Sequence, residues 1–167
     1  MQNSKAAVAW KLRTRTLDLT RPRIMGIVNV TPDSFSDGGE HATTEAAVAW
    51  GRKLAADGAD IIDVGGESTR PGAADVSLEE ELARVIPVVK TLAREGLIVS
   101  VDTSKPEVMR EAAAAGAEIL NDIRGFREVG APQAAAQSGC GLIVMHMQGT
   151  PSTMQKAPSY TDLIGEV

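Results

Sequence analysis

The sequence predicts an α/β fold built around a parallel sheet. Five short apolar runs, IMGIVN, IIDV, LIVSVD, EILND and LIVMHM, contain or end in the polar residues Asn29, Asp63, Asp102, Asn121 and His146. The first four runs are each followed by a helical stretch, as expected for parallel strands, because long crossovers must join them. Parallel strands place their carboxyl ends on one side of a sheet, so we expect these polar residues to converge on one site.

Apolar spacing and end signals place the helices at residues 44–57, 78–95, 105–115 and 131–138, with another beginning within 160–167. Ser77 with Glu80, and Ser104 with Glu107, have the capping-box spacing at the starts of the second and third helices. Pro87 lies inside the second helix, where we expect it to kink or split the helix.

The first 23 residues differ from the rest in charge, with six Lys or Arg against one Asp. Such a segment could be a nucleic-acid arm or a transit peptide. The alternation of apolar and polar residues in WKLRTRTLDL instead favours a short strand or hairpin that plugs one end of the fold. We therefore divide the chain into an N-terminal extension, residues 1–23, and one domain, residues 24–167.

Composition limits the functions that the chain can have. The net charge of −5 argues against nucleic-acid binding driven by overall charge. The single cysteine, Cys140, excludes an intramolecular disulfide framework and is expected to act as a small apolar residue. No apolar run approaches the roughly 20 residues of a membrane span, and no signal peptide is evident, so we expect a cytoplasmic protein without membrane contact.

Two loops rich in Gly, Pro and Ser follow the first two strands, at residues 31–42 and 65–76. Loops of this length inside a compact domain are often functional. In the second loop, Thr69 and Arg70 offer a hydroxyl and a planar guanidinium, which suit an anion better than a surface ion pair. In the first loop, Phe35 could either anchor the loop in the core or cover a flat aromatic substrate.

The strand ends carry the remaining candidates. Asp102 closes a strand that otherwise consists of core residues, so it needs a partner, and its carboxylate could accept two parallel N–H bonds from an aminopyrimidine-like edge. Asn121 can donate and accept, and the Asn29 oxygen suits Mg²⁺. Asp63 is expected to face the barrel interior in a supporting role, and His146 is a structural rather than a zinc-binding histidine. No GxSxG elbow, Walker loop or GxGxxG fingerprint is present.

The motifs MGIVNVTPDSFSDGG, DVGGESTRPGA, VSVDTSKPEV, ILNDI and MHMQGTP, in this order, resemble dihydropteroate synthase, a transferase of folate biosynthesis. The resemblance runs from about Leu17 to the last residue. It implies a TIM (β/α)8 barrel that condenses (7,8-dihydropterin-6-yl)methyl diphosphate with p-aminobenzoate and releases diphosphate with the help of Mg²⁺. It further implies a homodimer for the full-length protein and sensitivity to sulfonamides, which mimic p-aminobenzoate.

The same resemblance assigns roles to residues at the strand ends. Asn29 would lie beside Mg²⁺ and the diphosphate. Asp102 and Asn121 would hold the edge of the pterin ring, and Ile123 and Met145 would pack against it. Asp102 is further expected to favour the cation that builds on the pterin as diphosphate leaves.

The loops at residues 31–42 and 65–76 would supply the remaining site residues. Thr69 and Arg70 would bind the diphosphate, with Arg70 meeting the charge that builds on the leaving group. These two residues, with Pro71 and Phe35, would form the wall of the p-aminobenzoate pocket.

The chain departs from the resemblance in length, because it holds about the first five βα units of a fold with eight. The family's later pterin-binding Asp, its Lys and its final Arg-x-His motif have no counterpart here, so we expect these 167 residues alone to be inactive. The alternative is the pterin-binding domain of a corrinoid-linked methyltransferase, and a non-enzymatic binding module is a third possibility. The loop motifs TPDSFSDGG and STRPG favour the synthase.

Overall fold

The computed structural model describes residues 8–31, 39–68, 75–151 and 153–167, with a five-stranded sheet at the centre. The strands are β3 (Met25–Asn29), β4 (Ile61–Gly65), β5 (Val99–Asp102), β6 (Ile119–Asp122) and β7 (Gly141–Val144). Every strand pairs parallel with the next strand along the chain, so the spatial order is β3-β4-β5-β6-β7. The parallel sheet predicted from the sequence is confirmed.

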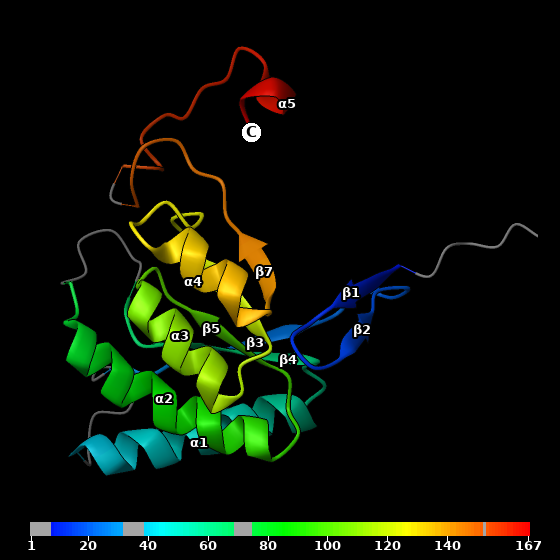
Figure 1. Cartoon of the computed structure of the whole chain (residues 1–167), viewed down its shortest axis with the longest axis vertical. Helices are drawn as coiled ribbons and strands as arrows, with labels where there is room; N and C mark the ends of the chain where they lie inside the picture. Colours follow the sequence, from blue (N-terminus) through cyan, green and yellow to red (C-terminus); the bar gives the residue numbers. More distant parts are fainter. Residues whose placement is uncertain (1–7, 32–38, 69–74, 152) are drawn as a thin grey trace, which may run out of the picture.

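The helices are α1 (Gly39–Ala56), α2 (Leu78–Arg94), α3 (Pro106–Ala115), α4 (Ala131–Ser138) and the short α5 (Leu163–Glu166). The first four lie side by side along one face of the sheet (Figure 1). A doubly wound sheet reverses its strand order and carries helices on both faces, whereas sequential order with helices on one face is the arc of a (β/α) barrel. Within the described residues, no helix is long and apolar enough to cross a bilayer.

Side chains alternate between the helix-covered face and the opposite face of the sheet. Val28, Ile62, Val64 and Val101 pack with helix residues such as Val85 in one buried cluster. The residues between them along the strands therefore point to the opposite face, which is the interior of the barrel.

Helix α2 begins as predicted but is not divided. The Ser77 side chain accepts a hydrogen bond from the backbone N–H of Glu80 at 3.2 Å, which confirms this cap. The expected split at Pro87 is wrong, because α2 continues through that residue to Arg94, whereas the expected kink stays a prediction. Pro87 is exposed, and the buried side chains on the opposite side of the helix, Val85 and Val88 among them, pack against the sheet and keep the helix continuous.

The predicted capping box at the start of α3 is also wrong. The residue at the N-cap position is Lys105, and its side chain does not cap the helix. Ser104 instead donates a hydrogen bond to Asp122 Oδ1 at 2.5 Å, on the neighbouring strand. The helix starts one residue later than the capping box requires, with Pro106 in its first turn, so Ser104 is free to connect the loop to β6.

The basic N-terminal segment contains the expected hairpin, β1 (Ala9–Lys11) paired antiparallel with β2 (Thr16–Asp18). Its Leu12 and Leu17 are buried against Ile61 and Ile119, which point into the barrel interior near the amino ends of the strands. Contact is so close that a Cβ on Gly141 would lie 2.8 Å from Leu12 Cδ2. The hairpin thus covers the interior face near the amino ends of the strands, opposite the expected site.

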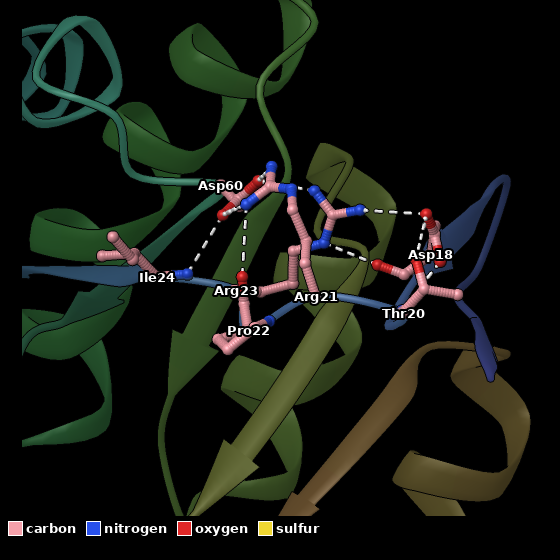
Figure 2. Close-up of polar contacts among 7 residues, drawn as sticks. All are labelled: Asp18, Thr20, Arg21, Pro22, Arg23, Ile24 and Asp60. Carbon is pink, nitrogen blue, oxygen red and sulfur yellow. Dashed lines mark hydrogen bonds and ion pairs between the residues drawn. The ribbon is translucent and has the colours of Figure 1, made fainter.

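The link from the hairpin to β3 is fastened to the residue before β4 (Figure 2). Asp60 accepts hydrogen bonds from Arg21 at 2.6 Å, from Arg23 at 2.8 Å and from the backbone N–H of Ile24 at 3.0 Å. These bonds, led by the one from Ile24, lower the pKa of Asp60 to about 2. Arg23 also donates to the backbone oxygen of Asp18 at 2.5 Å, so β2 is held to the same network.

Candidate functional site

Strand register places three of the predicted polar residues in one row. Asn29 is paired with Gly65, Gly65 with Asp102, Asp102 with Asn121, and Asn121 with Ile143. The row crosses all five strands near their carboxyl ends and faces the barrel interior, because its members alternate with residues of the helix-covered core. The predicted convergence of Asn29, Asp102 and Asn121 is therefore present.

Gly65 leaves a gap in this row between two polar side chains. A Cβ at Gly65 would lie 3.6 Å from the Cβ of Asp102 and 3.9 Å from Asn29 Oδ1. A larger residue there would occupy the space between the Asn29 amide and the Asp102 carboxyl. With glycine in place, a ligand that lies on the row can reach both side chains.

Asp102 is a half-buried acid whose environment opposes its ionisation. No hydrogen bond to its carboxyl is found among the described residues. Burial, and then the negative charges of Asp63, Asp122, Glu81 and Glu67, raise the pKa of Asp102 to about 7. A carboxylate at this position would require a hydrogen-bond partner that the described residues do not provide.

Asp63 lies one row below, toward the amino ends of the strands. It is 5% exposed, and its Oδ2 accepts a hydrogen bond from Asn121 Nδ2 at 3.2 Å. Burial is the largest influence on Asp63 and raises its pKa. The sequence-based expectation of an interior, supporting position is in accord with this geometry.

The apolar residues Ile123 and Met145 follow β6 and β7 directly. Asp122 pairs with Val144, so Ile123 and Met145 continue two adjacent strands past the polar row. Both side chains are half-buried, and the backbone N–H of Met145 donates to Asp122 O at 3.4 Å. They can form an apolar surface beside Asn121.

Sequence reasoning missed a buried ionic network beside the row. Lys105 contacts the carboxylates of both Glu67 and Glu81, and Glu81 also accepts a hydrogen bond from Thr103 at 2.6 Å. Lys105 loses hydration by burial, but the two acids outweigh this loss and raise its pKa. The available signal was Glu81, a carboxylate at an apolar position of the α2 pattern, where only a partnered acid is tolerated.

Two other predicted residues lie apart from the row. His146 is exposed, beyond the end of β7, and its Nε2 lies 3.0 Å from the Tyr160 hydroxyl, which fits the structural role that we expected. Cys140 is half-buried beside the cluster of Met109 and Phe126, and burial raises the pKa of its thiol. Four predicted site residues, Phe35, Thr69, Arg70 and Pro71, lie outside the described residues.

Comparison with known proteins decides the family. The model of a family described as "Pterin binding enzyme" matches residues 25–167, most of the chain. The chain belongs to this family.

The chain is highly similar in sequence to dihydropteroate synthases. The Escherichia coli (strain K12) dihydropteroate synthase is 60% identical over 153 residues, which cover 91% of this chain and 54% of that protein. The Yersinia pestis dihydropteroate synthase, solved in a sulfonamide drug complex, has a TM-score of 0.84 and 53% identity and covers 95% of this chain and 58% of its own. The Xanthomonas albilineans dihydropteroate synthase, solved with 4-aminobenzoic acid, has a TM-score of 0.84 and 54% identity, with 96% and 57% covered.

The chain spans about half the length of the curated relatives that it matches. Its five parallel strands and their helices superpose on the corresponding part of the synthase barrels, which confirms the partial (β/α) barrel and the resemblance drawn from the sequence motifs.

Proposed function

We propose that the protein containing this chain is a dihydropteroate synthase. It would join (7,8-dihydropterin-6-yl)methyl diphosphate to p-aminobenzoate and release diphosphate. The observation that carries the proposal is the interior row in which Asn29, Asp102 and Asn121 are held in register around Gly65. Its support comes from relatives that bear this name, among them the X. albilineans synthase solved with 4-aminobenzoic acid and also with 7,8-dihydropteroate.

The pterin would lie on the row with its donor edge toward the polar side chains. Asp102 would accept N–H bonds, and these bonds favour the ionised carboxylate that burial and the neighbouring acids disfavour. Asn121 would meet the same ring edge, and Ile123 with Met145 would pack on the ring plane. The diphosphate would extend toward Asn29 and the loop at residues 65–76.

The reaction exchanges one bond at the methylene carbon of the pterin. The arylamine nitrogen forms a C–N bond as the C–O bond to diphosphate breaks, the bonding pair leaves with the diphosphate, and the amine proton passes to solvent. Negative charge grows on the leaving group, where Thr69 and Arg70 would stabilise it, and positive charge grows on the pterin, beside Asp102. Phe35 and Pro71 would line the p-aminobenzoate pocket, which is where a sulfonamide would compete.

We further propose that Mg²⁺ accompanies the diphosphate. Asn29 offers one exposed carbonyl oxygen at the carboxyl end of β3, and no group of three or more His, Cys, Asp or Glu residues in the described part of the chain could hold a metal ion. This donor set fits Mg²⁺, which typically takes few protein oxygens and completes its shell with phosphate and water. When bound, Mg²⁺ would neutralise part of the leaving-group charge.

The test of function uses the full-length protein, for which we also propose a homodimer. Purified protein, dihydropterin diphosphate, p-aminobenzoate and Mg²⁺ should yield dihydropteroate and an equal amount of diphosphate. Methyl transfer from a methylated folate, without diphosphate release, would instead establish the corrinoid-linked alternative. For the metal, Mg²⁺ should tighten binding of the pterin diphosphate more strongly than binding of the hydroxymethyl pterin, and Asn29→Ala should reduce that difference.

A further inference from the structure

The starting observation is a hydrogen bond that crosses a strand. Asp63 is on β4 and Asn121 is on β6, and β5 lies between them. The residue of β5 in register with Asp63 is Ser100, which is fully buried. A small side chain at this position lets Asn121 Nδ2 reach Asp63 Oδ2 at 3.2 Å; a larger one would stand between them.

This contact distinguishes the two ends of the Asn121 amide. The oxygen and nitrogen of an asparagine side chain have nearly the same shape, so packing alone does not orient them. An ionised carboxylate only accepts hydrogen bonds, so Asp63 attracts the nitrogen and turns the oxygen away. The oxygen then becomes available in the row, next to the Asp102 carboxyl.

The same carboxylate is poorly compensated within the protein. Asp63 is 5% exposed, and by distance and angle neither its Oδ1 nor the Ser100 hydroxyl makes a full hydrogen bond in the described part of the chain, although the Ser100 hydroxyl lies close enough to lower the pKa of Asp63 against the larger, opposing effect of burial. Burial of an acid with so few hydrogen bonds is unfavourable for folding. Side chains that lower stability in this way are typical of binding and catalytic sites.

We propose that Asp63 is a positioning residue for the pterin, because its buried carboxylate holds the Asn121 amide by the nitrogen and presents the amide oxygen to the ligand. The inference rests on the proposed function, because it assigns the row to a pterin. Two acceptors side by side, Asn121 Oδ1 and Asp102, select a ring edge that carries adjacent N–H groups. Asp63 thus contributes to specificity without contact with the ligand.

The inference is tested with Asp63→Leu and Asp63→Asn in the full-length protein, with affinity for (7,8-dihydropterin-6-yl)methyl diphosphate measured by calorimetry. We expect Asp63→Leu to weaken this affinity about tenfold, as for a hydrogen bond to a charged group. Asp63→Asn should weaken it less, because an amide can still accept from Asn121 but no longer selects one orientation. The KM for p-aminobenzoate should change less than about twofold, and the melting temperature of Asp63→Asn should equal or exceed that of the wild type, since the buried charge is gone.

Two further variants separate positioning from general destabilisation. Glu118→Gln is the matched control, because Glu118 is also a buried carboxylate, 2% exposed, but bonds to Thr14 of the hairpin, away from the row. It should lower the melting temperature without a change in pterin affinity. In an Asn121→Ala background, Asp63→Leu should reduce the pterin affinity by less than about twofold, because there is no amide left to orient.

Each other outcome contradicts the inference. Wild-type pterin affinity in both Asp63 variants would exclude a positioning role. An undiminished effect in the Asn121→Ala background would show that Asp63 acts by another route, and an equal loss of pterin and p-aminobenzoate binding with a lower melting temperature would make it structural. If Asp63→Leu does not fold, the isosteric Asp63→Asn decides. Failure of the wild-type protein to bind the pterin would refute the proposed function itself.

Discussion

Lys105 Nζ lies 2.6 Å from Glu81 Oε2, a carboxylate of α2 that is 1% exposed. The same ammonium group contacts Glu67, at the base of the loop between β4 and α2. One cation before α3 therefore joins a buried acid of α2 to the segment that leads to Thr69 and Arg70. The stability of this region and the position of Glu67 therefore depend on the same side chain.

Lys105→Met should strongly destabilise the protein. It leaves the buried Glu81 carboxylate without its cation, and loss of one partner of a buried ion pair costs about 3–5 kcal/mol. Chemical denaturation of the full-length protein would measure the loss. Lys90→Met, which removes an exposed lysine of α2, the helix that carries Glu81, is the control and should change stability by less than about 0.5 kcal/mol. Addition of Glu81→Gln to Lys105→Met should restore part of the loss; no recovery would mean that packing, not charge, is responsible.

Asp102→Asn should stabilise the protein and abolish pterin binding. The pKa of Asp102 in the folded protein is about 7, above its unfolded value of about 3.9, so the folded state holds a proton that the unfolded state lacks between these values. Stability from this group therefore falls as the pH rises from about 4 to 7. After allowance for its partial exposure, the variant should gain on the order of 2 kcal/mol at pH 8 and less at pH 5.

Urea unfolding of wild type and Asp102→Asn at pH 5 and at pH 8 measures the gain in stability at each pH. Asp75→Asn, a change at an exposed acid before α2, serves as the control and should be neutral at both. A gain for Asp102→Asn that does not grow with pH would show that the carboxyl is not held protonated by its surroundings.

Asp60 has the opposite pH dependence. Its pKa is lowered to about 2 by hydrogen bonds from Ile24, Arg23 and Arg21, so its contribution is complete above pH 4 and is lost as the pH falls toward 2. Asp60→Asn should therefore lower the urea midpoint at pH 7 and converge on wild type near pH 2. A constant difference across this range would assign the effect to packing.

Arg70→Ala in the full-length protein should reduce kcat by about 100-fold or more, as expected for loss of a group that stabilises leaving-group charge. Because Arg70 is expected to act on the ligand, the melting temperature should change little. The control is Arg110→Ala, the same substitution at an exposed arginine of α3, and this variant should retain full activity. Wild-type kinetics for Arg70→Ala would remove this residue from the site.

A polypeptide of residues 1–167 alone should self-associate and show negligible turnover. Strand β7 is at the edge of the sheet, and its Leu142 and Val144 are 42% and 62% exposed. Open edges with apolar side chains pair with other chains. Size-exclusion chromatography with light scattering would detect the association, and a stable monomer would contradict the prediction. Lysine at positions 142 and 144 should increase the monomer fraction.

The polar row was predictable from sequence because it depends only on strand position. Asn29, Asp102 and Asn121 each end a run of apolar residues, and parallel pairing then brings those ends together without any knowledge of side-chain packing. The hydrogen bond between Asp63 and Asn121 was not predictable in the same way, because it depends on the small Ser100 between them and on the order of three strands.

The errors concern contacts between elements distant in sequence. Ser104 has the local pattern of a cap, but a hydrogen bond to Asp122, 18 residues later, determines its position. Pro87 has the local signal of a break, yet α2 remains continuous because its apolar side packs against the sheet. Tertiary packing overrides local preference in both cases.

The sequential order of β3 to β7 has a consequence for biosynthesis. Each strand pairs with the strand made immediately before it, so every newly translated βα unit finds its docking partner already complete. Assembly can then proceed in the direction of translation, with each pairing spanning only about one βα unit. The side chains of the interior row would be brought into place one after another, Asn29 first, as the ribosome advances.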